Sequence, residues 1–476
     1  MHVSSSAEAC HVLSRLDRQY SWTPPLHKVQ LPWRIILMAK RIAMLGAGSG
    51  FTEEITKGLC ACELLHDSTL VLMDIDDHRL ADSLERNQKL VGESGAPLQL
   101  TSTTDQRAAL AGCDYVVTSC EAKRIPYWIQ DIEIPKLHGV HQFKGENGGP
   151  GGQAHAMRNI TMFMRICDDM AELCPDAWLM NFTNPMSFLC TYFRAYTDLK
   201  ALGFCHQVHG SMGVIAEMLG HEPDAFEVIS GGVNHFNWLL DLRLKSTGES
   251  YMTQFAEQVR TSKYWQQIHH NIPAQKFTLD MLETFGIYPI GYDDHIIEYL
   301  PFFYDHTEWE ALGYHLEIDS LRAQQATAAE QSMVRQEYHD FPFPVDPDHP
   351  HYDEKPTQVM EALESGQRLY LPALVIPNRG AIDNLPDDAI VDVPAIIAGG
   401  EARGVHVGTL PTFAMELCRR QVTIHELLTQ ATVEGDRGKV VQAMALDPWV
   451  RHIKEARDVT DAFLDAYRED LPQFWS

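Results

Sequence analysis

The 476-residue chain has little positive charge. It carries 38 lysines and arginines against 65 aspartates and glutamates, a formal net charge of −27. Such a surface repels phosphodiester backbones and anionic lipid, so neither nucleic acid nor a membrane surface is an expected partner. No apolar run reaches the roughly 20 residues that a membrane-spanning helix needs. We therefore expect a protein without a membrane segment.

The ten cysteines include no C-x-x-C pair, although Cys60 and Cys62 form a C-x-C. This absence argues against a zinc ribbon or a thioredoxin-like redox motif. The first residues also lack the basic start, apolar stretch and small-residue cleavage site of a secretory signal. We expect mostly buried, reduced thiols and a cytoplasmic protein.

Hydrophobic periodicity divides the chain into three parts. Residues 1–37 show no clear period and contain Pro24-Pro25, so we expect an N-terminal arm or extension, or else a natural start at Met38. Residues 38–230 alternate between strand and helix patterns, and residues 231–476 combine strands with long helical stretches. The expected fold class is α/β: a Rossmann-type, mostly parallel sheet with helices on both faces, plus a mixed α+β C-terminal domain.

A dinucleotide-binding pattern opens the second part. An apolar strand, 41–45, runs into the glycine-rich turn 46–50; a helical pattern follows over 51–65, and a second buried strand, 69–73, ends at Asp74. Glycines let the backbone approach a pyrophosphate, and the helix N-terminus attracts it. An acid at the end of the second strand accepts bonds from a ribose diol, which favours NAD over NADP.

Further buried strands are predicted over 114–119, 178–182 and 201–204. In an open parallel sheet, ligands bind at the carboxyl ends of the strands. The residues at or just beyond these ends should therefore converge on one crevice: Asp74, Ser119, Asn184 and Cys205. The residues expected to bind the cofactor are Gly46, Gly48, Ser49, Asp74, Ser119 and Asn184.

A thiol and several imidazoles follow the last of these strands. Cys205-His206 and His209 precede His235 by about thirty residues. Thiolate and imidazole suit borderline-soft divalent ions, and two protein ligands with open positions suit a metal that binds substrate. The alternative is a buried strand end whose neighbouring histidines cap loops.

Two polar segments could add chemistry to this crevice. The glycine cluster 147–152 precedes a helical pattern and could cradle phosphate, although it lacks the Lys-Ser/Thr of a Walker loop; a lid or a close-packed turn is the alternative. The segment 288–295 brings two acids, a phenol and an imidazole together and could supply a general base. Its alternative is a hydrogen-bonded turn before a helix.

Taken in order and spacing, these pieces resemble glycoside hydrolase family 4, whose members are NAD- and divalent-metal-dependent glycosidases with a lactate/malate dehydrogenase-like fold. The resemblance runs from about residue 40 into the C-terminal region. It rests on the segments 46–49, 148–152, 183–185, 205–206, 232–235 and 378–386.

The resemblance implies hydrolysis by transient NAD oxidation of the sugar at C3, metal-assisted deprotonation at C2, elimination of the aglycone and addition of water. It implies Cys205 and His235 as ligands of Mn2+ or another divalent metal such as Co2+, Ni2+ or Fe2+. Asp293 is the first choice of base and Tyr292 its rival, while His206 assists as an acid or recognises substrate. The implied substrate-binding residues are Asn147, Asn184, His206, Asn234 and His295.

The Cys-His pair resembles the branches of the family that act on unphosphorylated sugars. We therefore expect a glycosidase for unphosphorylated glycosides, α-glycosides first and uronides second, working as a homodimer or homotetramer. Gln207, in the third position, matches none of the familiar branches. The segment 293–299 leans towards the uronide branches. The alternative function is an NAD-dependent dehydrogenase of the lactate/malate type acting on a sugar or hydroxy acid.

Overall fold

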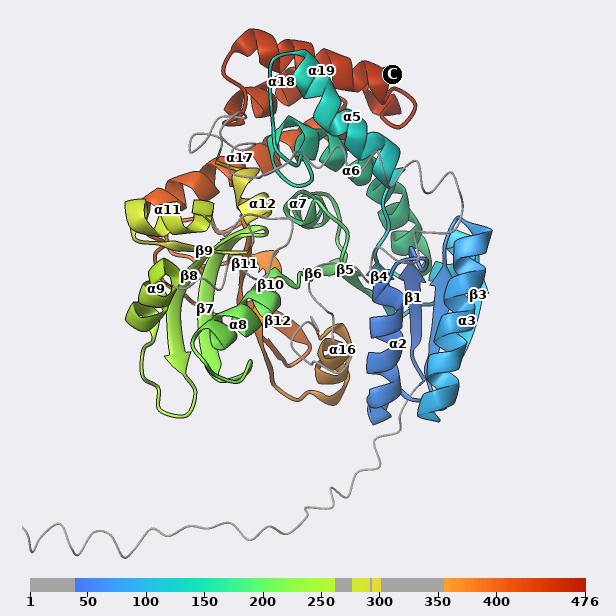
Figure 1. Ribbon diagram of the computed structural model, residues 1–476. Helices are drawn as coiled ribbons and strands as arrows, with labels where there is room; N and C mark the ends of the chain where they lie inside the picture. Colours follow the sequence, from blue (N-terminus) through green and yellow to red (C-terminus); the bar gives the residue numbers. More distant parts are fainter. Residues whose placement is uncertain (1–38, 262–275, 292, 301–354) are drawn as a thin grey trace, which may run out of the picture. The chain divides into compact units, whose positions relative to one another are not determined.

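A twelve-stranded sheet runs through the protein in the order β3-β2-β1-β4-β5-β6-β10-β11-β7-β8-β9, with β12 paired to β11 (Figure 1). The computed structural model describes residues 39–261, 276–291, 293–300 and 355–476. The N-terminal arm and Tyr292 therefore lie outside the described residues.

The first six strands are parallel and have the strand order of a dinucleotide-binding sheet. The strands β1, β2, β4 and β5 are short apolar runs that are mostly buried, as a sheet covered by helices requires. By contrast, β3 is largely exposed, and β6 is buried only in its second half. The bounds of the six strands are β1 Arg41–Leu45, β2 Thr69–Met73, β3 Gln99–Thr103, β4 Tyr115–Thr118, β5 Trp178–Asn181 and β6 Lys200–Gly203.

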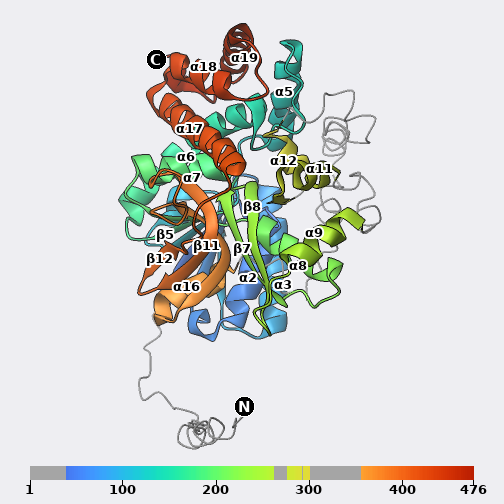
Figure 2. The ribbon, with the colours of Figure 1, turned by 90° about the vertical axis from the view of Figure 1, so that its left-hand side faces the viewer.

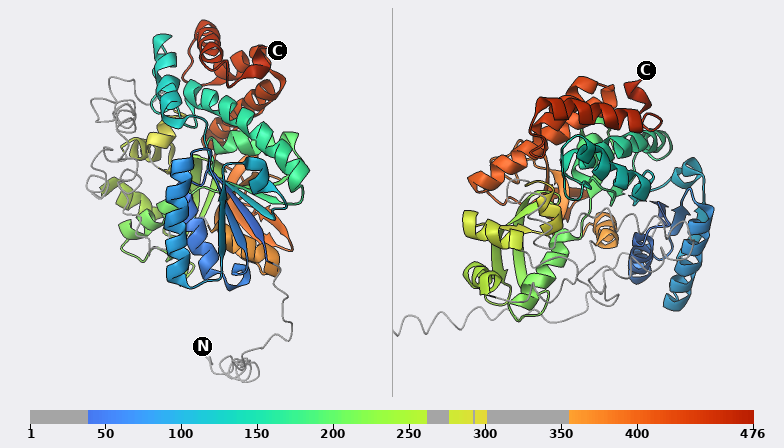
Figure 3. Two further views of the ribbon diagram at one scale, coloured as in Figure 1. Left: turned by 90° about the vertical axis from the view of Figure 1, so that its right-hand side faces the viewer. Right: turned by 45° about the horizontal axis from the view of Figure 1, so that its top comes forward.

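Helices connect these strands and confirm the expected α/β class. In the left-hand view of Figure 3, α2 and α3 lie side by side along the parallel strands. The helices of this half are α2 Phe51–Ala61, α3 Asp77–Ser94, α4 Gln106–Leu110, α5 Arg124–Leu137, α6 Gly149–Leu173 and α7 Met186–Tyr196. The helical pattern over 51–65 is two elements, because α2 ends at Ala61 and a 3-10 turn, Glu63–Leu65, follows.

The second half extends the same sheet with antiparallel strands. These are β7 Phe226–Val233, β8 Phe236–Leu244, β9 Tyr288–Ile290, β10 Leu369–Pro377, β11 Ile390–Ala398 and β12 Glu401–Gly404. For this part of the chain the sequence predicts a mixture of strands and long helical stretches, without β10, β11 or β12. Of these strands β10 joins the halves, because it pairs with β6, and β11 continues the sheet from β10 to β7.

Helices also cover this half. In Figure 2, α8 and α9 lie along the β7–β8 hairpin, and α17 crosses near α6 and α7. The bounds are α8 Gln207–Met218, α9 Met252–Thr261, α11 Lys276–Phe285, α12 Asp293–Ile297, α16 Pro356–Ser365, α17 Thr412–Glu434, α18 Arg437–Leu446 and α19 Ile453–Ala466. Within the described part of the chain, every helix is too short or insufficiently apolar to cross a membrane.

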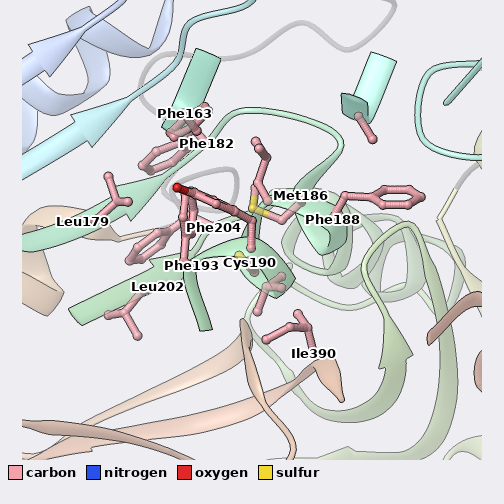
Figure 4. Packing of buried hydrophobic residues seen from close by; sticks show 14 of the residues in the cluster. Phe163, Leu179, Phe182, Met186, Phe188, Cys190, Phe193, Leu202, Phe204 and Ile390 are labelled. Carbon is pink, nitrogen blue, oxygen red and sulfur yellow. The ribbon is translucent and has the colours of Figure 1, made fainter. Parts of the chain in front are cut away.

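A tightly packed apolar cluster lies behind the end of β6 (Figure 4). The rings of Phe182 and Phe204 stack with centroids 5.2 Å apart. A β-carbon at Gly203 would lie 2.7 Å from the Met186 sulfur and 2.9 Å from the Cys190 sulfur, so β6 can pack here only because position 203 is glycine. This packing fixes the point at which the chain leaves the sheet and reaches Cys205.

Candidate functional site

The predicted cofactor residues come together around the first glycine turn. Gly46 has φ 83°, and a β-carbon there would lie 2.2 Å from the Ser119 carbonyl oxygen. The amide of Gly48 donates to Asp74 Oδ2 at 2.8 Å, and the hydroxyls of Ser49 and Ser119 are 2.8 Å apart. The ends of β1, β2 and β4 thus meet in one loop that tolerates only glycine at position 46.

This loop is open to solvent where α2 begins. Gly50 is the N-cap of α2, is exposed, and supplies no side-chain cap. A β-carbon at Gly50 would meet no atom within 4 Å. The first turn of α2 can therefore receive an anion from solvent, with the helix dipole in its favour.

The predicted metal corner, Cys205 with His235, is formed by two separate chain reversals. Cys205 is half-buried between β6 and α8, and the exposed His206 is the N-cap of α8. His235 is the second residue of the two-residue turn between β7 and β8, where its φ of 61° is unusual for a residue with a side chain. Its imidazole is buried, and Nδ1 has no hydrogen-bond partner.

Burial favours the neutral form of the His235 ring. It lowers the pKa of His235 well below the ordinary 6.5, and the nearby His295 and His206 add to the effect against the opposing charge of Glu146. A neutral imidazole with a free nitrogen is the form that binds a metal. The same interaction places His206 within electrostatic range of His235.

His295, Glu298 and Glu146 form a cluster of side chains beside His235. The ring of His295, from α12, lies 4.3 Å from the His235 ring, centroid to centroid. His295 Nδ1 is 3.9 Å from Glu146 Oε2 and 3.6 Å from Glu298 Oε1. Glu146, His295 and Glu298 present ligand atoms that all lie within 4.8 Å of one another, close enough to hold a cation. Neither glutamate was predicted as a site residue.

Glu298 occupies the second glycine cluster. Its Oε2 accepts from the backbone N–H groups of Glu146, Asn147 and Gly148 at 2.8, 2.7 and 2.8 Å. The cluster therefore holds a carboxylate of the protein itself, and the phosphate cradle considered from the sequence is not free for a ligand. Gly149 and the residues after it form the first turn of α6, so the close-packed alternative describes the structure.

Glu146 stays ionised despite its burial. Burial alone would raise the pKa of its carboxyl, but Lys144, then His295, Arg124 and His235, lower it to about 2. Lys144 Nζ is 3.7 Å from Glu146 Oε2, and Arg124 Nη2 is 3.8 Å from Oε1. The Asn184 amide donates to Glu146 Oε1 at 3.4 Å. Glu146 is therefore a fixed acceptor at the carboxyl end of β5 rather than a proton donor.

The buried Tyr299 lies within electrostatic range of Cys205 and of both glutamates, Glu146 and Glu298. Burial raises the pKa of Tyr299 well above 10, and the charges of Glu298, Glu146 and Cys205 contribute in the same direction. Cys205 therefore lies within electrostatic range of the same phenol as both glutamates. The two chain reversals and the cluster of acids share one region at the edge of the sheet.

The structure gives the surroundings of two further predicted residues, Asn147 and Asn234. The side-chain amide of Asn147 is buried without a partner for Nδ2, while its backbone is bound to Glu298. Asn234 donates to Asp392 Oδ2 at 3.3 Å, and its Oδ1 has no partner. Asp293 begins α12, and Tyr292 directly before it lies outside the described residues.

Gln207 is the first residue of α8 and faces the segment that carries the predicted base. Its side chain is 2% exposed, and neither amide atom has a hydrogen-bond partner. The amide packs on Gly291, where a β-carbon would lie 1.8 Å from Gln207 Nε2. Such a buried amide without a partner is suited to a polar ligand group.

The late polar segment 378–386 does not belong to this site. The Asn378 amide donates to the carbonyls of Ile382, Leu385 and Pro386, and its Oδ1 accepts from the Ile382 amide. Because β10 is antiparallel to β6, the chain after Pro377 leads away from the end of β6 that carries Cys205. The segment is a self-bonded turn that connects β10 to β11.

Comparison with known proteins identifies the family of this chain. The model described as "Family 4 glycosyl hydrolase" matches residues 41–221, and its C-terminal domain matches residues 230–450. The chain belongs to the family 4 glycosyl hydrolases. The resemblance found in the sequence is thereby confirmed, and the chain is a glycoside hydrolase.

Relatives span nearly the whole chain. An alpha-glucosidase of Erwinia rhapontici is 29% identical over 461 residues, covering 90% of this chain and 98% of the relative. An alpha-galacturonidase of Thermoanaerobacter italicus is 26% identical over 451 residues, covering 90% of this chain and 97% of the relative. The fold matches that of a 6-phospho-alpha-glucosidase from gut microorganisms, which was solved in complex with NAD and Mn2+. The TM-score is 0.75 at 22% sequence identity, and the match covers 92% of this chain and 100% of the other.

Proposed function

We propose that this family 4 glycosidase hydrolyses unphosphorylated α-glycosides with bound NAD and a divalent metal, Mn2+ first, as cofactors. The observation that carries the proposal is a chain of contacts between the glycine loop at Gly46 and the Glu146 side of the metal corner. Ser119 lies against Gly46, the backbone amide of the next residue, Cys120, donates to Thr183 Oγ1, and Asn184 donates to Glu146.

The first glycine loop fits NAD. Its backbone approaches Ser119 so closely that position 46 has no room for a side chain, and α2 begins at an exposed residue without a side-chain cap. Asp74 has two carboxylate oxygens, each with one backbone donor, Gly48 to Oδ2 and Asp76 to Oδ1. Each oxygen keeps a lone pair for a ribose hydroxyl, which favours NAD.

The metal corner fits a borderline-soft divalent ion. It offers a half-buried thiol and a buried imidazole whose neutral form is favoured and whose Nδ1 has no hydrogen-bond partner. Sulfur and nitrogen donors of this kind suit Mn2+, Fe2+, Co2+ or Ni2+ better than Mg2+. The anionic Glu146 nearby would help to balance the charge of the ion.

The side chains would act as follows. Bound NAD would accept and return a hydride at C3 of the sugar, while the metal would polarise the C2 and C3 oxygens. Asp293, with Tyr292 as the alternative, would take the proton from C2. Glu146 and Asn184 would orient sugar hydroxyls, and His206 would assist departure of the aglycone as an acid.

The charges beside Glu146 support an unphosphorylated substrate. Lys144 and Arg124 both lie within 4 Å of this carboxylate, and Arg124 also pairs with Glu121, so both cations already have carboxylate partners within the protein. The Cys205-His206 pair supports the same substrate class. Uronides are the second candidate, because an alpha-galacturonidase is among the relatives and the segment 293–299 resembles the uronide branches.

Nitrophenol release from a panel of substrates tests this proposal. Reduced protein is incubated with nitrophenyl α-glucoside, α-galactoside, α-galacturonide and 6-phospho-α-glucoside, with and without NAD and Mn2+. We expect release from at least one unphosphorylated substrate, loss of release when either cofactor is omitted, and no release by Cys205→Ser. Cleavage of the phosphorylated substrate alone would contradict the substrate class, and NADH accumulation without cleavage would favour a dehydrogenase.

We further propose a cytoplasmic homodimer or homotetramer. The acidic net charge and the scattered reduced cysteines support the compartment. Light scattering of the purified protein measures the oligomeric state, and a monomer at micromolar concentration would contradict it.

A further inference from the structure

We propose that Asp392 is a positioning residue that holds the His235 turn in place and thereby sets the affinity of the metal corner for a divalent ion. The inference rests on the proposed function. Asp392 lies in the middle of β11 and would not touch the metal.

Hydrogen bonds from both arms of the turn converge on Asp392. Asn234, the residue before His235, donates its side-chain amide to Asp392 Oδ2 at 3.3 Å. Asn237, two residues after His235, donates its side-chain amide to the Asp392 carbonyl oxygen at 3.0 Å. The two asparagines bracket His235, so movement of either arm would break a bond to the same residue.

Asp392 also links the two strands that lead to the metal corner. It pairs with Gly232 in β7, three residues before His235, and with Val375 in β10. Val375 in turn pairs with Gly203 in β6, two residues before Cys205. One row of paired residues therefore runs from the Cys205 strand to the His235 strand through Asp392.

The burial of the Asp392 side chain argues against a role in packing alone. It is 1% exposed, its Oδ1 has no hydrogen-bond partner, and its neighbours Val391 and Val393 are fully buried apolar residues of the kind this strand position favours. A buried carboxylate costs stability when hydrogen bonds compensate it only in part, so its presence here points to a specific arrangement that needs it. The φ of 61° at His235 is such an arrangement, because a strained residue persists only where its surroundings fix it.

Calorimetric titration of Mn2+ into reduced, NAD-saturated protein tests the inference. The Asp392→Val variant keeps a residue that is common in strands and removes the side-chain acceptor. We expect the Kd of this variant for Mn2+ to rise about tenfold or more, as it does when other residues that orient metal ligands are replaced. Asp392→Asn keeps an oxygen that can accept from Asn234, and its Kd should stay within about threefold.

Two further variants separate positioning from general damage. Tyr115→Phe removes another hydrogen bond to a carboxylate, that of Tyr115 in β4 to Glu364 in α16, and should lower Tm without changing the Kd for Mn2+. Should Asp392→Val fail to fold, Asn234→Ala removes the other partner of the same bond. It should weaken Mn2+ binding by about the same factor.

The outcomes are distinct. A Kd for Mn2+ within about threefold of the wild type in Asp392→Val, or in Asn234→Ala where Asp392→Val does not fold, would overturn the inference and leave the proposed function standing. Unchanged Mn2+ affinity in Cys205→Ser would instead overturn the metal corner itself, and with it the reason for a positioning residue. Weakened binding in Asp392→Val with near-normal binding in Asp392→Asn and Tyr115→Phe supports the inference.

Discussion

Two glycine-rich segments precede helices in this chain, and they differ in whether their backbone amides are open to an external anion. The first, at residues 46–50, is half-buried to exposed except at the buried Ala47, and a side chain at Gly50 would meet nothing within 4 Å. The second, at residues 147–152, is buried throughout, and three of its region's amides converge on Glu298. The first loop can receive an anion from outside, whereas the second already holds one from the protein.

The comparison teaches that a glycine cluster before a helix identifies an anion site but not the anion. The occupant of the second cluster comes from a residue about 150 positions later in the chain. By binding it, the cluster fixes Glu146 and α12 relative to each other and so helps to build the site around His235.

Removing the internal anion should have the largest effect. Glu298→Ala leaves three buried N–H groups without an acceptor, and we expect it to lower the free energy of unfolding by about 3–5 kcal/mol. Glu298→Gln keeps one acceptor oxygen and should cost about half as much. Urea denaturation measures both, and a loss below about 1 kcal/mol in Glu298→Ala would show that the second cluster does not depend on its carboxylate.

A side chain in the first loop should impair cofactor binding. Gly46→Ala places a methyl group against the Ser119 carbonyl in a backbone conformation that costs roughly 1–2 kcal/mol for other residues. We expect Kd for NAD to rise about tenfold or more. Gly50→Ala is the matched control, because its methyl group meets no atom within 4 Å and should leave Kd nearly unchanged. Equal effects in the two variants would refute the role of the first loop.

The pH dependence of stability should reveal the contribution of Asp447, which is linked through Trp449 to Glu298 in the second glycine cluster. Asp447 accepts from the Trp449 backbone amide, and the Trp449 indole donates to the Glu298 carbonyl. Burial raises the pKa of Asp447 from the ordinary 3.8 to about 6. The folded state therefore keeps this proton longer than the unfolded chain, so the contribution to stability is full below about 3.8 and is lost as pH rises through 6.

Asp447→Asn removes this titration. The stability of the wild type relative to Asp447→Asn should fall by about 1–3 kcal/mol between pH 4 and pH 7. Urea denaturation at both pH values measures the difference. A constant difference across this range would mean that Asp447 titrates at its ordinary pKa.

The smallest expected effect concerns substrate choice at Gln207. Gln207→Glu keeps the shape of this buried side chain and adds a negative charge near the sugar. It should lower kcat/KM for a uronide relative to the matching neutral glycoside by roughly fivefold, the effect of about 1 kcal/mol. An unchanged ratio would place Gln207 outside the sugar-binding region.

Much of the first half could be predicted from the sequence because local patterns determine it. Buried apolar runs predicted all of β1, β2, β4, β5 and β6 to within a residue or two, and strand ends predicted the meeting of Asp74 with the glycine loop. The principle is geometric, since parallel strands bring their carboxyl ends to one edge.

The second half resisted prediction because its determinants are distant in sequence. Glu298 and Glu146 become site residues only through a contact between α12 and the start of α6, and neither has a local signal. The apolar runs of β10 and β11 carry no local sign of their pairing with β6 and β7, which lie more than 150 residues earlier. The sequence around Asp392 gives no local sign of the role proposed for it, which depends on hydrogen bonds from Asn234 and Asn237.

One measurement tests the central claim most directly: the isotope at C2 of the released sugar after hydrolysis in D2O with NAD and Mn2+. If Asp293 or Tyr292 removes the C2 proton while the sugar is oxidised at C3, NMR of the product will show deuterium at C2. Hydrolysis that leaves C2 fully protonated would contradict the account, because the bond would then be cleaved without the redox step for which the NAD loop and the metal corner are proposed.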